Sequence, residues 1–180
     1  MSAVVVYESM FGNTHTIAER IGEGLAPLGE VHVVPVAEAT DDLVAGATLL
    51  VVGGPTHAHG MTSKMSREGA VEHPETYGDD IEVDPDAEGP GLRDWFDSLA
   101  KADHVSAAAF DTRVGTIGAV LSGRASKGIH KRLKHHGFRE VADPESFLVD
   151  KQTHLMEGEA DRARAWGAGL ADAVAGTPAT

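Results

Sequence analysis

The first 25 residues hold a strand, a short polar loop and a helix, and this succession limits how the chain can fold. Three consecutive valines, Val4–Val6, predict a strand that is buried on both faces, as in a parallel sheet. Ile17, Ile21 and Leu25 recur every four residues and predict one face of a helix over Asn13–Leu25. The chain therefore begins with the first half of a βαβ unit.

The loop between this strand and helix has the composition of an anion site. A helix N-terminus offers main-chain N–H groups and the positive end of the helix dipole. A Walker loop needs Gly-Lys-Ser/Thr, and a dinucleotide fingerprint needs three spaced glycines; this loop has Gly12 alone and no lysine or arginine. Two interpretations stay open: a phosphate cradle built without a positive side chain, and a turn that binds nothing. The candidate residues are Ser9, Met10, Phe11, Gly12, Asn13 and Thr14.

Further strands and helices alternate along the chain, which predicts an α/β fold with a parallel sheet and helices on both faces. The predicted strands are Val4–Val6, Val31–Val34, Thr48–Val52, Val105–Phe110 and Ser146–Val149. The predicted helices are Asn13–Leu25, Leu92–Leu99, Arg124–His136 and Glu159–Val174. The crossover between Val36 and Gly46 is too short for a long helix. Five such strands suit a doubly wound sheet of order 2-1-3-4-5.

In this order a ligand binds beyond the carboxyl ends of the strands, where strands 1 and 3 are neighbours. The loops that leave strands 3 and 4 should therefore join the first loop in one site. The strand 3 loop supplies Pro55, Thr56, His57, Ala58, His59 and Gly60 as candidates. The end of strand 4 supplies Phe110, Asp111, Thr112 and Arg113.

The first loop resembles the FMN-phosphate loop of flavodoxins, Ser/Thr-x-Thr-Gly-Asn-Thr. The matching residues are Ser9, Gly12, Asn13 and Thr14, while Met10 and Phe11 stand where hydroxyl residues are usual. That variant is similar to the FMN-binding quinone reductases related to the tryptophan-repressor-binding protein. The run Gly53–Met61 resembles the second flavin loop of the same family. The chain is thus identified as a member of the flavodoxin-like family, which implies FMN as cofactor and an electron-transfer role.

The resemblance also implies roles for single residues. The first loop would hold the phosphate, and Pro55, Thr56, His57 and the segment Phe110–Thr112 would frame the isoalloxazine ring. His57 and His59 lie where the family usually has an aromatic residue, so they either form a wall, stack, or exchange a proton. No side chain needs to act as a catalytic nucleophile or acid in electron transfer.

Several alternatives remain at these loops. Asp111 and Arg113 either meet the polar edge and charge of a ligand or pair with each other to hold the loop. The basic residues in the first turn of the helix after Ser122 face either solvent or the phosphate of a nicotinamide nucleotide. The pair His57-x-His59 lacks a third ligand for a metal. No metal site is predicted.

Composition bounds the class of protein. With 180 residues the chain predicts one domain, 1–175, with an acidic insert at about 72–90 and a flexible tail at 176–180. The absence of cysteine excludes disulfides, thiolate metal sites and a cysteine nucleophile. A net charge of −13 argues against nucleic-acid binding. The sequence has no membrane span and no signal peptide, which predicts a cytoplasmic protein.

The charges are separated along the chain. Glu72–Glu88 holds eight acidic residues and no Lys or Arg, whereas Thr112–Arg139 holds seven Lys or Arg and no acidic residue. Each run is either a solvated face or part of a polarised surface that orients a protein partner. Within the acidic run, Asp84–Gly89 imitates half of an EF-hand loop, but Trp95 stands where the bidentate glutamate is needed, which excludes a specific calcium site.

The sequence leaves three functions open. The first is an FMN protein that carries electrons to a redox partner protein. The second is an NAD(P)H-dependent reductase of a small-molecule acceptor such as a quinone, with Arg113 or Arg124 as an anion contact. The third is a flavin-free interaction module that uses the acidic insert.

Overall fold

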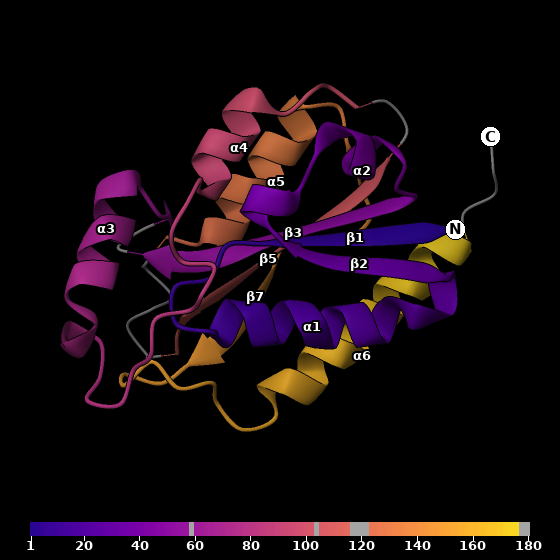
Figure 1. The fold of residues 1–180 in the computed structure, drawn as a ribbon. Helices are drawn as coiled ribbons and strands as arrows, with labels where there is room; N and C mark the ends of the chain where they lie inside the picture. Colours follow the sequence, from indigo (N-terminus) through magenta and orange to yellow (C-terminus); the bar gives the residue numbers. More distant parts are fainter. Residues whose placement is uncertain (58–59, 103–104, 116–122, 177–180) are drawn as a thin grey trace.

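A computed structural model describes residues 1–57, 60–102, 105–115 and 123–176. Its sheet has the order β2-β1-β3-β5, with β6 and β7 both alongside β5, and every pair in this series is parallel (Figure 1). The strands are β1 Ser2–Tyr7, β2 Glu30–Pro35, β3 Leu49–His57, β5 Ser106–Val114, β6 Arg139–Glu140 and β7 Glu145–Val149. A short strand, β4 Gly60–Met61, pairs with β3 in antiparallel fashion. The predicted doubly wound α/β fold is confirmed.

The predicted fifth strand, Ser146–Val149, is present as β7, and the structure adds a short strand, β6, at the same edge of the sheet. β6 pairs with Ser106 and Ala107 at the start of β5, and β7 pairs with Phe110–Val114 at its end. This edge of the sheet is therefore made of two short strands joined by a loop.

Helices cover both faces of the sheet (Figure 1). On one face lie α1 Asn13–Leu25 and α6 Glu159–Ala175, and on the other lie α2 Asp41–Ala45, α4 Leu92–Ser98 and α5 Ala125–His135. The chain also has 3₁₀ turns at Ala26–Leu28, Val36–Glu38 and Pro74–Thr76. The four predicted helices are present, and α1 has the predicted bounds.

The helix α3, Lys64–Glu72, was not predicted from the sequence and lies beyond the carboxyl ends of the strands (Figure 1). Only Arg67 and Ala70 of its residues are buried, and Met65 is exposed, so it has no apolar stripe to signal a helix. Its start is fixed locally instead, because the side chains of Ser63 and Ser66 form a reciprocal capping box.

The strand β1 lies between two hydrophobic cores and contributes side chains to both. Val4 and Val6 pack into the core under α4 and α5, while Val5 and Tyr7 pack into the core under α1 and α6. This alternation follows the two-residue period of a strand, and burial on both faces explains the run of valines. The loop that follows β1 thus leaves from a rigid part of the sheet.

Two glycines bring α1 and α6 into close contact. A Cβ atom at Gly24 would lie 2.1 Å from the carbonyl oxygen of Arg164, and one at Gly167 would lie 2.4 Å from that of Ile21. Because these neighbours are main-chain atoms, neither position can accept a side chain without separating the helices. The contact fixes the helix that starts at the first loop.

Among the described residues, no helix is long and apolar enough to cross a membrane. Residues 177–180 of the predicted tail lie outside the described part of the chain.

Candidate functional site

A cavity of about 250 Å³ lies at the carboxyl ends of β1, β3 and β5. It brings together the three loops that the sequence indicated, and it approaches the lower end, about 300 Å³, of typical small-molecule sites. The predicted residues that line it are Met10, Phe11, Asn13, Thr14, Pro55, Thr56, His57, Thr112 and Arg113. Residues that were not predicted complete the walls: Thr62, Ser66, Ala70, Tyr77, Val114, Val149 and Thr153.

The N-terminus of α1 borders this cavity and has no side-chain cap. Gly12 occupies the N-cap position with φ 79°, a left-handed conformation that favours glycine. The first turn of the helix contains no acidic residue, so nothing on the helix neutralises its positive end. Because the first N–H groups of a helix have no partner within it, this end can receive an anion.

Hydroxyl groups support the loop and retain donors. The Oγ of Ser9 accepts a hydrogen bond from the Gly12 N–H at 3.2 Å, which leaves its own O–H free to donate. The Oγ1 atoms of Thr14 and Thr112 lie 2.7 Å apart, and since their hydrogen bond uses one hydroxyl proton, the other remains available. Asn13 instead anchors the loop, because its Nδ2 donates to the Thr153 carbonyl at 2.6 Å.

Aromatic rings form one wall of the cavity. The centroids of Phe11 and Tyr77 are 4.8 Å apart, and those of His57 and Tyr77 are 6.2 Å apart. Tyr77 comes from the acidic insert, and its carbonyl accepts a hydrogen bond from Thr153 at 3.0 Å. The sequence did not place Tyr77 at the site, because the family resemblance led us to expect an aromatic residue in the loop after β3. The available signal was that Tyr77 stands as an aromatic residue within the acidic run Glu72–Glu88.

Phe110 does not line the cavity, although the sequence placed it at the ligand ring. Its side chain is fully buried and contacts Phe147 and Trp166 in the core beneath α6. A Cβ at Gly53 would lie 2.2 Å from the Phe110 ring, so this glycine makes room for a core side chain. A Cβ built at Gly54 would likewise lie only 2.6 Å from the Cδ1 atom of Leu92. The paired glycines thus serve internal packing.

Asp111 is also buried away from the cavity. Its Oδ2 accepts hydrogen bonds from Thr56 Oγ1 at 3.0 Å and from the Ser126 N–H at 2.8 Å. Thr56 Oγ1 in turn accepts from the Ala125 N–H at 2.8 Å. These groups cap the N-terminus of α5 from two neighbouring strands, and the Asp111 carboxylate opposes its dipole. The basic first turn of this helix therefore has an internal anion beside it.

The remaining candidates occupy other places in the loops. Ser9 is buried and does not line the cavity, and Gly60 pairs with His57 in the short β3–β4 hairpin. Ala58 and His59 lie outside the described residues.

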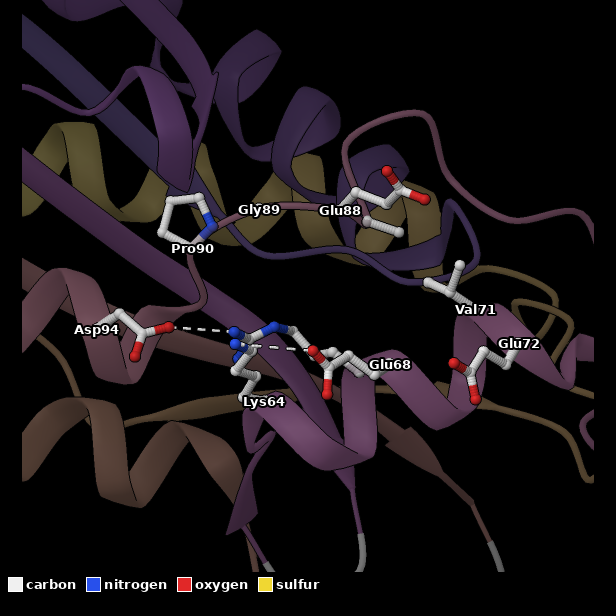
Figure 2. A pocket seen from close by; sticks show the side chains of 10 residues that line it. Lys64, Glu68, Val71, Glu72, Glu88, Gly89, Pro90 and Asp94 are labelled. Carbon is white, nitrogen blue, oxygen red and sulfur yellow. Dashed lines mark hydrogen bonds and ion pairs between the residues drawn. The ribbon is translucent and has the colours of Figure 1, made fainter.

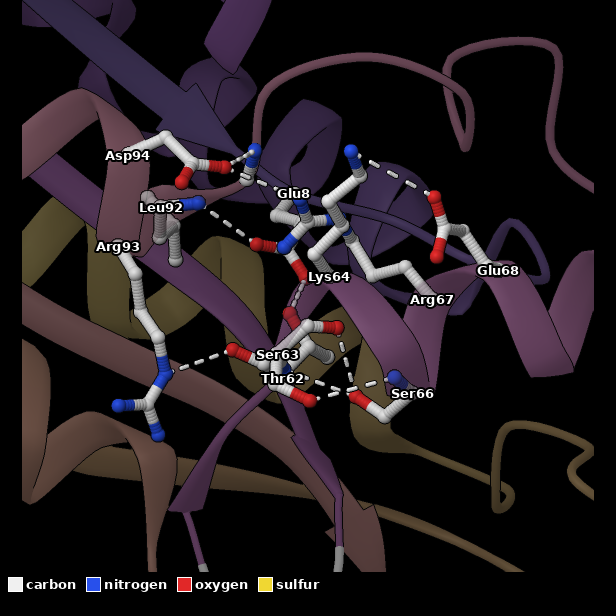
Figure 3. Close-up of polar contacts among 11 residues, drawn as sticks. Glu8, Thr62, Ser63, Lys64, Ser66, Arg67, Glu68, Leu92, Arg93 and Asp94 are labelled. Atoms are coloured by element: carbon white, nitrogen blue, oxygen red, sulfur yellow. Dashed lines mark hydrogen bonds and ion pairs between the residues drawn. The ribbon is translucent and has the colours of Figure 1, made fainter.

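A buried glutamate holds the elements around the site. The side chain of Glu8 accepts hydrogen bonds from the Thr62 hydroxyl and from the Leu92 N–H, the latter at 2.7 Å (Figure 3). It thereby ties the end of β1 to the segment before α3 and to the first turn of α4. Nearby, the buried Arg67 donates to Asp94 at 3.1 Å. The Gly91 N–H, assisted by Arg67, lowers the pKa of Asp94.

A larger cavity, of about 630 Å³, lies between α3 and the end of the acidic insert (Figure 2). Lys64 and Arg67 face it together with four carboxylates, those of Glu68, Glu72, Glu88 and Asp94. This excess of negative charge opposes a phosphate, and the residues come from none of the strand ends. The smaller cavity is the better candidate for the functional site.

The family model for flavodoxins matches residues 5–166 of the chain. No curated protein matches the sequence closely.

Solved structures share the fold across almost the whole chain. A flavodoxin from the domain Archaea superposes with a TM-score of 0.66 at 21% identity, covering 97% of this chain and 99% of its own. A WrbA-like flavodoxin from Agrobacterium tumefaciens gives 0.61 at 16% identity, covering 97% of each chain. Rubredoxin oxygen:oxidoreductase from Desulfovibrio gigas gives 0.63 at 16% identity, covering 97% of this chain and 36% of its own. At these identities the likeness establishes the fold alone.

Proposed function

The chain belongs to the flavodoxin family, and on that premise we propose that it is an electron carrier that exchanges electrons with a protein partner. Flavodoxins bind FMN and transfer electrons to redox partners. FMN, when bound, supplies the redox chemistry, and the chain supplies binding and electrostatics.

The described residues fit the phosphate of FMN. The uncapped N-terminus of α1 supplies main-chain donors and the dipole, and Gly12 leaves its approach open, since nothing lies within 4 Å of a Cβ built there. The Thr14–Thr112 pair at the cavity wall retains a hydroxyl donor, and the Ser9 Oγ holds the Gly12 N–H behind it. The absence of a lysine or arginine in this loop is compatible with an anion held by amides.

One observation carries the choice of an electron carrier: Tyr77 joins Phe11 at the cavity wall, with ring centroids 4.8 Å apart. By the family resemblance, aromatic walls and negative surroundings disfavour added negative charge on the flavin ring and so keep its potential low. The net charge of −13 acts in the same direction. His57 lines the same wall without needing to exchange a proton.

The surface beside the cavity favours a partner with a basic face. Tyr77 belongs to the run Glu72–Glu88, so the segment that supplies part of the cavity wall carries eight acidic residues and no Lys or Arg. Complementary charge accelerates and orients such an encounter.

The second candidate is an NAD(P)H-dependent reductase of a quinone or similar small molecule. His57 and Arg113 favour it, because both line the cavity where a second substrate would approach. The sequence offered the basic side chains at the start of α5 to a nucleotide phosphate. Against this candidate, the first two amides of that helix are already bound by Thr56 and Asp111, and the Asp111 carboxylate lies beside them.

The first test titrates the apo-protein with FMN and follows flavin fluorescence. Stoichiometric binding is expected, and its absence would leave the flavin-free interaction module as the surviving candidate. The loaded protein is then reduced photochemically and mixed with cytochrome c, a basic acceptor protein. An electron carrier reduces it rapidly and more slowly as salt rises. Steady NADPH oxidation with a quinone, with no added reductase, would favour the second candidate.

A matched pair of variants tests the aromatic wall. Tyr77→Leu should raise the reduction potential of the bound flavin, whereas Tyr77→Phe, which keeps the ring, should not. An equal shift in both variants would contradict the role given to the ring.

A further inference from the structure

A group of three side chains lies next to the first loop but outside the cavity. His15 is in the first turn of α1, and Asp84 and Asp86 come from the acidic insert. One nitrogen of His15 and one carboxylate oxygen from each aspartate lie within 4.8 Å of one another. His15 Nδ1 and Asp84 Oδ2 are 3.5 Å apart.

Asp84 has a buried carboxylate oxygen that receives no hydrogen bond from the described residues. The residue is 5% exposed, and the oxygen concerned is Oδ2. A buried carboxylate oxygen without a donor is costly. The oxygen points at a ring nitrogen that, when it carries no proton, offers a lone pair.

The other polar atoms of the three side chains are held in place. His15 Nε2 faces Glu19 at 3.7 Å, and the ring stacks on Tyr7 with centroids 4.4 Å apart. Asp84 Oδ1 accepts from the Asp86 N–H at 2.9 Å, and Asp86 Oδ2 accepts from the Tyr7 hydroxyl at 2.9 Å. A carboxylate behind a histidine and hydrogen bonds behind carboxylates are the supports that orient metal ligands.

We propose that His15, Asp84 and Asp86 bind a divalent transition-metal ion of the Zn²⁺ type. One imidazole nitrogen and two carboxylate oxygens are ligands that Zn²⁺ accepts, and the nitrogen argues against Ca²⁺ or Mg²⁺, which prefer oxygen alone. Ligands about 2.0–2.2 Å from a tetrahedral Zn²⁺ are separated by roughly 3.4 Å, close to the His15–Asp84 distance. Asp86 is exposed, so an ion can enter and keep a water ligand.

A second histidine shows what distinguishes this group. His154 also has two aspartates beside it, but Asp80 faces its Nε2 at 3.1 Å and Asp150 faces its Nδ1 at 3.5 Å. The two carboxylates therefore lie against different ring nitrogens, and a single ion cannot contact all three side chains. His154 provides the matched control.

The proposed site would join the acidic insert to the first loop. The main-chain N–H of Asp84 already donates to the Met10 carbonyl at 2.8 Å, and His15 lies three residues after Gly12. A bound ion would add a second cross-link between these segments.

The test is calorimetric titration of the FMN-loaded protein with Zn²⁺. We expect one strong site per chain. Asp84→Asn and His15→Phe, which keeps an aromatic ring on Tyr7, should each raise Kd at least ~10-fold, whereas His154→Phe should leave this step unchanged. Asp86→Asn alters an exposed side chain and provides a third ligand variant that keeps the fold.

Two outcomes would overturn the proposal. One is the absence of a strong Zn²⁺ site in the unaltered protein, which would make His15 and Asp84 an ion pair only. The other is a site that survives Asp86→Asn and His15→Phe but disappears in His154→Phe.

Discussion

Two helices, α1 and α5, begin at the same edge of the sheet, yet their N-termini are completed in different ways. The start of α1 has a glycine, no side-chain cap and no acid in its first turn. The start of α5 also lacks a cap of its own, but Thr56 and Asp111 from β3 and β5 bind its first two amides. The protein thus closes one helix terminus with its own groups and leaves the other available for an anion.

The difference shows how a buried charge can contribute to stability at one terminus while its absence allows binding at the next. Asp111 neutralises the dipole of α5 and links three elements. At α1 a carboxylate in the equivalent place would occupy the phosphate position. Four substitutions test this difference between the two helix termini.

The largest effect is expected for Asp111→Ala. It removes the acceptor of two hydrogen bonds and leaves the Ser126 N–H buried without a partner, so the free energy of unfolding should fall by about 3 kcal/mol. Urea denaturation of the apo-protein measures this change. As a control, Asp143→Ala alters an exposed aspartate and should stay within ~0.5 kcal/mol of the unaltered protein. A fall below ~1 kcal/mol in Asp111→Ala would contradict its role as the cap.

Gly12→Asp should break the open terminus. A carboxylate beside the phosphate position should raise the Kd for FMN about 100-fold, equivalent to ~2.8 kcal/mol at 1.4 kcal/mol per tenfold. Fluorescence titration gives the number. Gly12→Ala separates charge from strain: it has room for its methyl group, and its positive φ costs about 1–2 kcal/mol of stability. If both variants bind FMN equally weakly, backbone strain and not charge is responsible.

Thr56→Val keeps the shape of the cavity wall but removes the hydroxyl that accepts from the Ala125 N–H. Loss of an N-cap of this kind costs ~1–2 kcal/mol. Urea denaturation should show the loss, and Thr56→Ser should restore most of the stability. A large change in FMN affinity in Thr56→Val would mean that this hydroxyl also contacts the ligand.

The smallest effect is expected for Thr16→Asp, on the exposed side of the first turn of α1. The added charge should stabilise the apo-protein by ~0.5 kcal/mol through the helix dipole. It should weaken FMN binding a few-fold at low salt, and added salt should remove most of that difference. Thr16→Asn, without the charge, should change neither quantity; a matching effect there would exclude the electrostatic explanation.

The sequence was sufficient for the parts of the fold that depend on local pattern. The valines of β1 and the four-residue repeat of α1 follow from burial and periodicity, whereas the order of the strands came from the flavodoxin-like fold that five such strands suit. The same information located the three loops that meet at the cavity.

The parts that the sequence missed depend on distant partners. Phe110 occupies the core because Gly53, on the neighbouring strand, leaves space for its ring, and a single strand does not reveal this fit. Tyr77 reaches the cavity from the insert, whose path no periodic pattern predicts. Asp111 was indicated as a ligand contact, but it binds the N–H of Ser126 in the first turn of α5, 15 residues away in the sequence.

The edge of the sheet made of β6 and β7 has a consequence for association between chains. An unbroken edge strand offers a row of main-chain donors and acceptors on which another molecule can add a strand. Here β6 and β7 interrupt that row, and at the opposite edge β2 carries Glu30 and His32 and ends at Pro35. Both margins are therefore poor templates for aggregation, which matters for a parallel sheet whose non-local pairing makes it slow to fold.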